Sequence, residues 1–91
     1  MKIVLRVKIL NKIGLHARPA ARFVEACKKY KSSIIVKKND AQANGKSLLD
    51  LLKLNVLQGD EIEIIIDGDD ADNAKNAIID IINRINNGEI Q

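Results

Sequence analysis

Two segments of this 91-residue chain alternate between apolar and polar or charged residues, and this alternation limits the possible folds more than any other feature. In Lys2–Ile9 and again in Glu61–Asp67, an apolar residue occupies every second position. Because side chains point alternately to the two faces of a β-strand, each segment is predicted to be a strand with one buried face. A sheet built from such strands is covered on one face and meets solvent on the other.

Other segments repeat their apolar residues with the spacing of a helix. The segment from Ala17 to about Lys29 and the segment that begins at Ala71 each carry a single apolar stripe, so both are predicted helices. The acidic residues Asp69, Asp70 and Asp72 suit the positive end of the last helix. A short helix is predicted from Ser47 to about Lys53, and two short strands are predicted at residues 33–38 and 41–44.

The predicted order of elements is therefore β-α-β-β-α-β-α. The simplest arrangement is an α+β fold, an open-faced β-sandwich in which three helices cover one face of a four-stranded, mainly antiparallel sheet. A chain of this length has enough apolar residues for one core, and we expect a single domain over residues 1–91.

Composition excludes several classes of function. Cys27 is the only cysteine, and its place on the apolar stripe predicts a buried thiol; we expect no disulfide, no metal site and no cofactor. Charges interrupt the apolar residues at the amino terminus and no stretch is long enough to span a bilayer, so we expect a cytoplasmic protein. The net charge of +3 suits an acidic or phosphorylated partner, whereas one Phe and one Tyr offer little stacking surface for nucleic acid.

The only histidine, His16, lies where the first strand should lead into the first helix. Pro19 has no N–H and is tolerated only in the first turn, which places His16 at or just before the helix start. The backbone N–H groups of Ala17 and Arg18 would then lack helical partners and could bind an anion beside the imidazole, with the Arg18 guanidinium as a counter-charge. The same pattern also fits a histidine that merely caps the helix or lies at the surface.

The residues around His16 favour the chemical interpretation. GLHARPAARFV, residues 14–24, resembles the active-site segment of HPr, the histidine-containing phosphocarrier of the bacterial phosphoenolpyruvate-dependent phosphotransferase system (PTS). His16 stands where that family has its phosphorylated histidine, and Arg18 and Pro19 match the arginine and proline beside it. GKSLL, residues 45–49, resembles the regulatory segment of the family, and QGDEI, residues 58–62, extends the resemblance over essentially the whole chain.

The resemblance implies a covalent carrier rather than an independent catalyst. Phospho-enzyme I would transfer its phosphoryl group to Nδ1 of His16, and His16 would pass it to a IIA domain of a sugar permease. Ser47 stands where some members are phosphorylated by the HPr kinase/phosphorylase, and a transcriptional regulator would be a further partner. We expect this chain to act as a monomer, in sugar uptake.

The short helix around Leu48–Leu54 offers a surface for these partners. Its leucines spread over more than the roughly 100° stripe that one core contact requires, so some of them should face solvent. We expect Leu48, Leu49 and Leu52 to form an apolar patch with Arg18, Lys46 and Lys53 at its basic rim. A wholly buried helix is the alternative.

Two residues depart from the family pattern. Ile13 replaces the small polar residue that many sugar-type members carry before Gly-Leu-His, and Asp50 replaces a common glycine or lysine. The run from Asn11 to Gly14 looks more like the nitrogen-related branch of the PTS, which is the alternative function. A mainly regulatory member that binds partners through the Ser47 surface is another, and Ser47 can also be a plain helix cap.

Overall fold

The computed structural model describes residues 1–91 and contains the seven elements in the predicted order. The strands are β1 (Lys2–Lys8), β2 (Ser33–Lys38), β3 (Ala41–Asn44) and β4 (Glu61–Asp67). The helices are α1 (Ala17–Lys28), α2 (Leu48–Lys53) and α3 (Ala71–Asn86). The predicted strands and helices are thus confirmed, with differences of about one residue at their ends.

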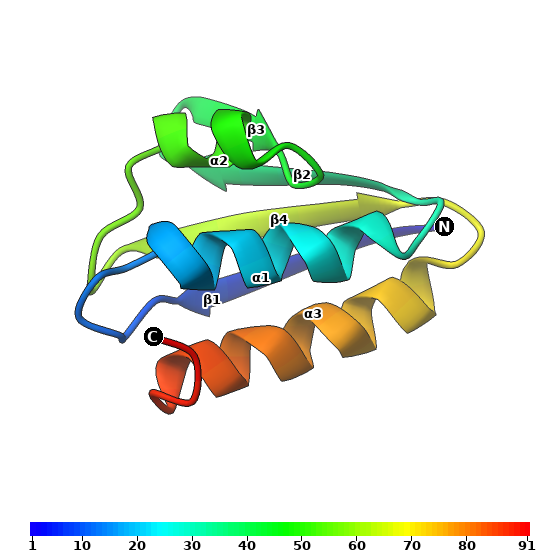
Figure 1. Cartoon of the computed structure of the whole chain (residues 1–91). Coiled ribbons are helices and arrows are strands. Elements are labelled where there is room, and N and C mark those ends of the chain that lie inside the picture. Colours follow the sequence, from blue (N-terminus) through cyan, green and yellow to red (C-terminus); the bar gives the residue numbers. More distant parts are fainter.

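The four strands form one sheet in the order β1-β4-β2-β3, and every pairing in it is antiparallel. Helices α1 and α3 run across one face of this sheet, while α2 lies over its β2–β3 side and contacts α1 and β3 (Figure 1). No helix covers the opposite face. The α+β open-faced sandwich expected from the sequence is therefore confirmed.

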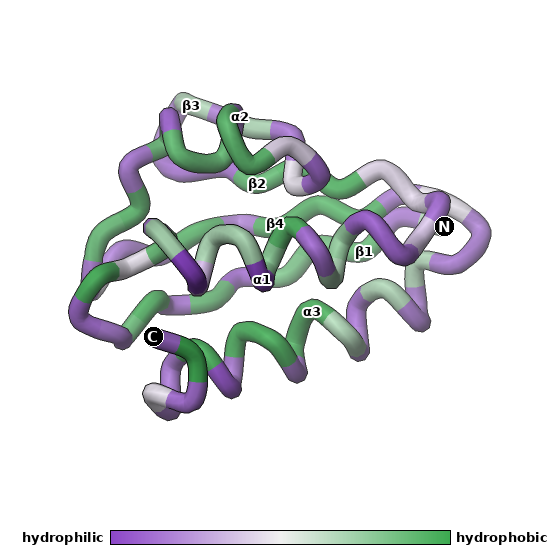
Figure 2. Tube along the Cα trace, viewed as in Figure 1, coloured by the Kyte–Doolittle hydropathy of each residue, from purple (hydrophilic) through white to green (hydrophobic).

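The core lies between the sheet and the helices and consists of 22 buried residues. The apolar positions of the strands and the apolar stripes of α1 and α3 meet there, as the hydropathy colouring shows (Figure 2). Phe23 is the only aromatic residue in the core, and Cys27 is buried beside it on α1, where desolvation raises the pKa of the thiol to about 12. No helix of the protein is long and apolar enough to cross a membrane.

Charged residues on the uncovered face pair across neighbouring strands. Lys2, Arg6 and Lys8 of β1 stand opposite Asp67, Glu63 and Glu61 of β4. Arg6 Nε and Glu63 Oε2 are 3.2 Å apart, and the Arg6 side chain remains 73% exposed. Such an exposed pair contributes little to stability, which fits a surface in contact with solvent.

The start of α3 carries the expected acidic residues, and one of them makes a further contact. Asp70 is its N-cap residue, but its carboxylate makes no capping hydrogen bond to α3. It accepts hydrogen bonds from the Ser32 hydroxyl and from the backbone N–H groups of Lys31 and Ser32. These bonds, led by that of the hydroxyl, lower the pKa of Asp70 to about 2. The acidic residue predicted to support its own helix thus also joins α3 to the α1–β2 loop.

Candidate functional site

His16 is the N-cap residue of α1, as the position of Pro19 predicts. It lies at the end of the molecule where the β1–α1 and α2–β4 loops meet (Figure 1). Its backbone is extended, with φ −130° and ψ 165°, and its side chain makes no capping hydrogen bond. The half-buried imidazole has no hydrogen-bond partner in the chain, so both ring nitrogens are free for chemistry.

Two backbone donors lie directly after His16. The first hydrogen bond of α1 joins the N–H of Ala20 to the carbonyl of His16, at 3.4 Å. The N–H groups of Ala17 and Arg18 come before it and have no partner. Free donors at the positive end of a helix attract anions. The structure therefore places two unpartnered backbone donors beside His16.

The chain turns sharply where it enters α1, because Ala17 has a positive φ of +50°. This conformation costs a residue other than glycine about 1 kcal/mol. The strained residue follows the histidine directly and carries one of the two free N–H groups. Nothing in the sequence predicts it, since alanine is an ordinary residue for the first turn of a helix.

The backbone before His16 is held by another loop. The N–H of Leu15 donates to the carbonyl oxygen of Val56 at 3.0 Å, and both residues are completely buried. Gly14 lies against the same carbonyl with φ +66°, and a Cβ atom there would collide with the Val56 oxygen. Within the β1–α1 loop, Asn11 Nδ2 donates to the carbonyl of Gly14 at 2.8 Å. The α2–β4 loop is thus the support on which the histidine segment rests.

The Arg18 side chain is exposed and forms neither an ion pair nor a hydrogen bond. Its guanidinium can therefore move toward an anion at the start of α1 without breaking an existing contact. Pro19, the next residue, is buried and anchors this first turn against the core.

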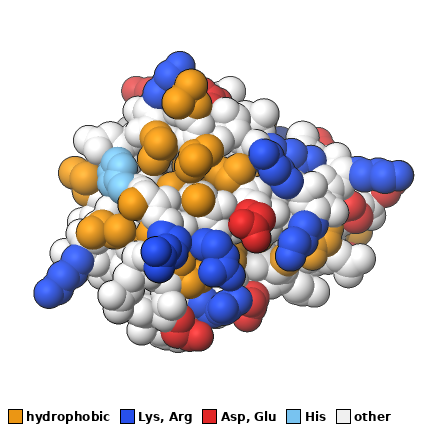
Figure 3. Space-filling model, in the orientation of Figure 1, with side chains coloured by type: hydrophobic (Ala, Val, Ile, Leu, Met, Phe, Trp, Pro, Cys, Tyr) orange, Lys and Arg blue, Asp and Glu red, His pale blue; other side chains and the backbone are white.

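Helix α2 exposes some of its leucines, as predicted. Leu49 is 73% exposed and Leu48 is 40% exposed, whereas Leu52 is partly buried and packs against the core. Hydrophobic side chains gather on this side of the molecule, and the histidine lies at their edge (Figure 3). Leu51 of α2 and Leu54, its C-cap residue, are buried, so the same short helix contributes side chains to the patch and to the core.

The expected basic rim of this patch is only partly present. Lys53 and Arg18 are exposed, but Lys46 is half-buried and its ammonium donates to the carbonyl of Tyr30 at 2.6 Å. Lys46 was expected at the rim, and this bond holds its ammonium at the Tyr30 carbonyl. The bond joins the β3–α2 turn, which contains Lys46, to the α1–β2 loop, which contains Tyr30.

Ser47 is the N-cap of α2, and its hydroxyl accepts a hydrogen bond from the N–H of Asp50 at 3.2 Å. The Asp50 carboxylate in turn accepts the N–H of Asn44 at 2.6 Å. The capping role that the sequence allowed for Ser47 is confirmed. Asp50, the residue that departs from the family pattern, stabilises the turn before α2 with its carboxylate.

Sequence reasoning missed the contribution of the α2–β4 loop. QGDEI marks its end, but Val56 acts through its backbone carbonyl, which every residue has, so no residue pattern could reveal it. Asn55, with φ +50°, is the one local signal, since asparagine tolerates the left-handed conformation better than most residues.

The chain is similar to a known family over most of its length. The family model described as the PTS HPr component phosphorylation site matches residues 4–84. The phosphocarrier protein HPr of Neisseria meningitidis serogroup A is 42% identical over 77 residues, which cover 85% of this chain and 86% of that protein.

Two solved structures extend this similarity. HPr-C-His from Thermoanaerobacter tengcongensis superimposes with a TM-score of 0.89 at 38% identity and covers 93% of this chain and 96% of the other. Crh, the Bacillus subtilis catabolite repression protein, superimposes with a TM-score of 0.72 at 32% identity over 87% of this chain and 91% of the other. That Crh structure is an intertwined dimer formed by swapping, which bears on the expectation of a monomer.

Proposed function

The chain belongs to the HPr family of PTS phosphocarrier proteins, and we propose from this that His16 carries the phosphoryl group. The observation that most supports this role is the unpartnered imidazole of His16 next to the unpartnered N–H groups of Ala17 and Arg18. A nucleophile and the donors for an anion thus lie together at one helix start.

In the proposed reaction, the lone pair of His16 Nδ1 attacks the phosphorus atom of phospho-enzyme I. The new N–P bond forms while the bond from phosphorus to enzyme I breaks, and the electron pair of that bond stays on enzyme I. The phosphoryl oxygens accept hydrogen bonds from the N–H groups of Ala17 and Arg18, and the Arg18 guanidinium supplies positive charge. Transfer to a histidine of a IIA domain repeats the step, with His16 as the leaving group.

The decisive experiment is incubation of the full chain with phosphoenolpyruvate and enzyme I. Intact mass should increase by one phosphoryl group that acid removes, in the wild type and in Ser47→Ala but not in His16→Ala. An unmodified wild type in the presence of active enzyme I would contradict the proposal. A phosphate that is stable to acid and still present in His16→Ala would show that a different residue is modified.

Leu48, Leu49 and Leu52 are proposed as the docking patch for enzyme I and IIA domains. The exposure of Leu48 and Leu49 supports this role, and so do the hydrophobic side chains that gather next to the histidine in Figure 3. A phosphate on Ser47, added by a kinase, would bring negative charge to the edge of the patch and so weaken the binding of acidic partners. We propose a monomer in this reaction, and gel filtration at micromolar concentration would test it.

For the physiological relay we propose sugar uptake, with the nitrogen-related branch as the second candidate. The family relatives named above are HPr and Crh proteins, whereas the exposed Ile13 next to the histidine segment favours the nitrogen-related branch. Phosphoryl transfer from the loaded chain to a sugar-type IIA domain, measured against a nitrogen-type IIA domain, would distinguish them. The faster acceptor identifies the branch.

A further inference from the structure

The position of His16 depends on the carbonyl group of Val56, which lies in a different loop. The N–H of Leu15, the residue before His16, donates to this carbonyl, and Gly14 is pressed against it. A displacement of Val56 would therefore move the backbone on which the imidazole and the Ala17 N–H are mounted. The question is what holds Val56.

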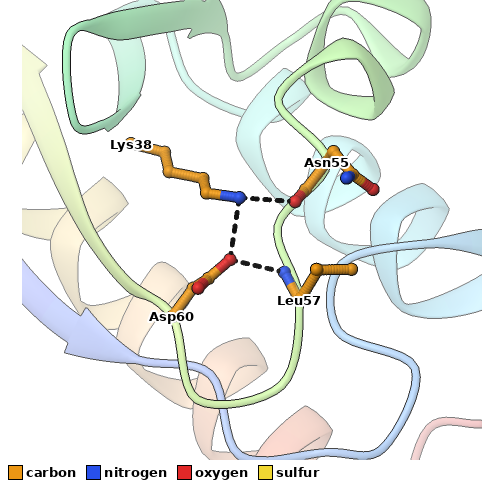
Figure 4. Close-up of polar contacts among 4 residues, drawn as sticks. All are labelled: Lys38, Asn55, Leu57 and Asp60. Carbon is orange, nitrogen blue, oxygen red and sulfur yellow. Dashed lines mark hydrogen bonds and ion pairs between the residues drawn. The ribbon is translucent and has the colours of Figure 1, made fainter.

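Two charged side chains hold the residues on either side of Val56 (Figure 4). Lys38 Nζ donates to the carbonyl of Asn55 at 2.7 Å and pairs with Asp60 Oδ2 at 2.9 Å. The same Asp60 oxygen accepts the N–H of Leu57 at 2.8 Å. The loop is thus fixed directly before and directly after Val56.

Both side chains extend from the ends of strands. Lys38 is the last residue of β2, and Asp60 directly precedes β4, which pairs with β2 in the sheet. The pair therefore attaches the α2–β4 loop to the ends of two paired strands. Asn55 adopts a left-handed conformation, with φ +50°, so the loop needs contacts of this kind to hold its shape.

This ion pair differs from the other close one on the same sheet. Lys38 and Asp60 are 21% and 30% exposed and both bond to the backbone of the loop. Arg6 is 73% exposed, and its pair with Glu63 involves only the two side chains. The hydrogen bond from the Leu57 N–H to the Asp60 carboxylate, followed by that from Lys38, lowers the pKa of Asp60.

We infer that Lys38 and Asp60 are positioning residues for His16. They hold Asn55 and Leu57, these residues hold the Val56 carbonyl between them, and that carbonyl fixes Leu15 and the start of α1. The histidine and the free N–H groups are therefore arranged before the phosphoryl group arrives, which lowers the cost of reaching the transition state. The kinetic part of this inference rests on the proposed phosphocarrier function, whereas the geometric part does not.

The geometric part is tested by hydrogen exchange of the Leu15 amide in the unphosphorylated full chain. Loss of a charged hydrogen bond in Lys38→Met should speed this exchange about tenfold. The control Arg6→Met removes the same charge from the same sheet and should leave Leu15 unchanged. Asp60→Asn, with Glu63→Gln as its control, repeats the test should Lys38→Met fail to fold. Unchanged Leu15 exchange in the folded variants would overturn the inference.

The kinetic part is tested by phosphoryl acceptance from phospho-enzyme I. Lys38→Met should lower kcat about tenfold and leave KM unchanged, because the leucine patch that meets the partner is intact. Lys38→Arg, which keeps the charge and a backbone donor, should recover most of the rate. A rise in KM alone, or an unchanged kcat despite faster Leu15 exchange, would refute a positioning role.

These readouts separate the inference from the proposed function. A wild type that accepts no phosphoryl group would refute the carrier role while the exchange of Leu15 still reports on the positioning contacts. A wild type that accepts it normally, with Lys38→Met equally fast, would refute only the role of Lys38 and Asp60.

Discussion

The starts of α1 and α2 show two different ways to begin a helix. Both N-cap residues, His16 and Ser47, have an extended backbone. Ser47 uses its hydroxyl to accept the N–H of Asp50, while His16 leaves its ring free and the following N–H groups unpartnered. The first arrangement stabilises a six-residue helix, and the second leaves an anion site open.

A helix start that leaves its N-cap side chain and first N–H groups unpartnered is supported here from outside the helix. At α2 the cap is local, within four residues of sequence. At α1 the support comes from the Val56 carbonyl, from Asn11 and from the close approach of Gly14, all of which act on residues before the histidine. The side chain and the free donors then remain available for a phosphoryl group.

The largest expected effect comes from blocking the close approach at α1. Gly14→Ala would force a Cβ atom into the Val56 carbonyl at a left-handed position, and should lower the free energy of unfolding by about 3 kcal/mol. Gly88→Ala has a similar φ of +80° but open space around it, and should cost only about 1 kcal/mol. Urea denaturation measures both, and equal losses would show that the Val56 contact is unimportant.

A charge on α2 should separate docking from chemistry. Leu49→Asp should reduce phosphoryl acceptance at low concentrations of phospho-enzyme I about tenfold, equivalent to about 1.4 kcal/mol. Stability should change by less than about 0.5 kcal/mol, because Leu49 is 73% exposed. Ile79→Asp, at an exposed position of α3, is the control and should accept at the normal rate. Normal acceptance by Leu49→Asp would remove α2 from the docking surface.

The capping difference predicts a smaller effect on stability. Ser47→Ala removes the hydroxyl that caps α2 and should lower the free energy of unfolding by about 1 kcal/mol. His16→Ala removes a side chain that caps nothing and should stay within about 0.5 kcal/mol of the wild type. Thermal unfolding of the two variants side by side gives the comparison. The prediction is contradicted if His16→Ala is less stable than Ser47→Ala.

The third helix start gives the smallest effect, and that effect depends on pH. Because the pKa of Asp70 falls from 3.8 to about 2 on folding, its ionised form stabilises the protein above pH 4 and this contribution is lost as pH falls through about 2. Asp70→Asn should therefore lower Tm slightly at pH 6, and this difference should shrink as the pH approaches 2. A difference in Tm that persists unchanged at pH 2 would assign it to a cause other than ionisation.

The sequence predicts the elements well because each has its own local signal, which is periodicity in the longer elements and capping or β-branched residues in the shorter ones. The alternation in Glu61–Asp67 and the bounds Ser33–Lys38 agree with β4 and β2, and Pro19 correctly places His16 at a helix start. Contacts between distant loops carry no such signal. The bond from Leu15 to Val56 joins two backbone groups, and Asp70 bonds to Ser32 although its neighbours suggested a role in its own helix.

Charge patterns were equally ambiguous for the surface. Lys46 and Lys53 looked equivalent in the sequence, but only the fold brings a free carbonyl, that of Tyr30, within reach of Lys46. Nothing in the sequence distinguishes Lys38 from its neighbour Lys37, and its partner Asp60 lies more than twenty residues away. Whether a charged residue is a free surface residue or a structural one therefore depends on loops that are distant in the sequence, and only the structure reveals it.

The pairing of β1 with β4 has a consequence for how the protein is made. β1 leaves the ribosome before its partner strand β4 and before the Val56 carbonyl, because α1, β2, β3 and α2 lie between them in the sequence. Contacts so distant in sequence require long loops to close, which slows folding. A nascent or partly unfolded chain therefore contains His16 without the contacts that position it. If His16 is the phosphoryl acceptor, only a chain that is synthesised and folded through β4 would be phosphorylated efficiently.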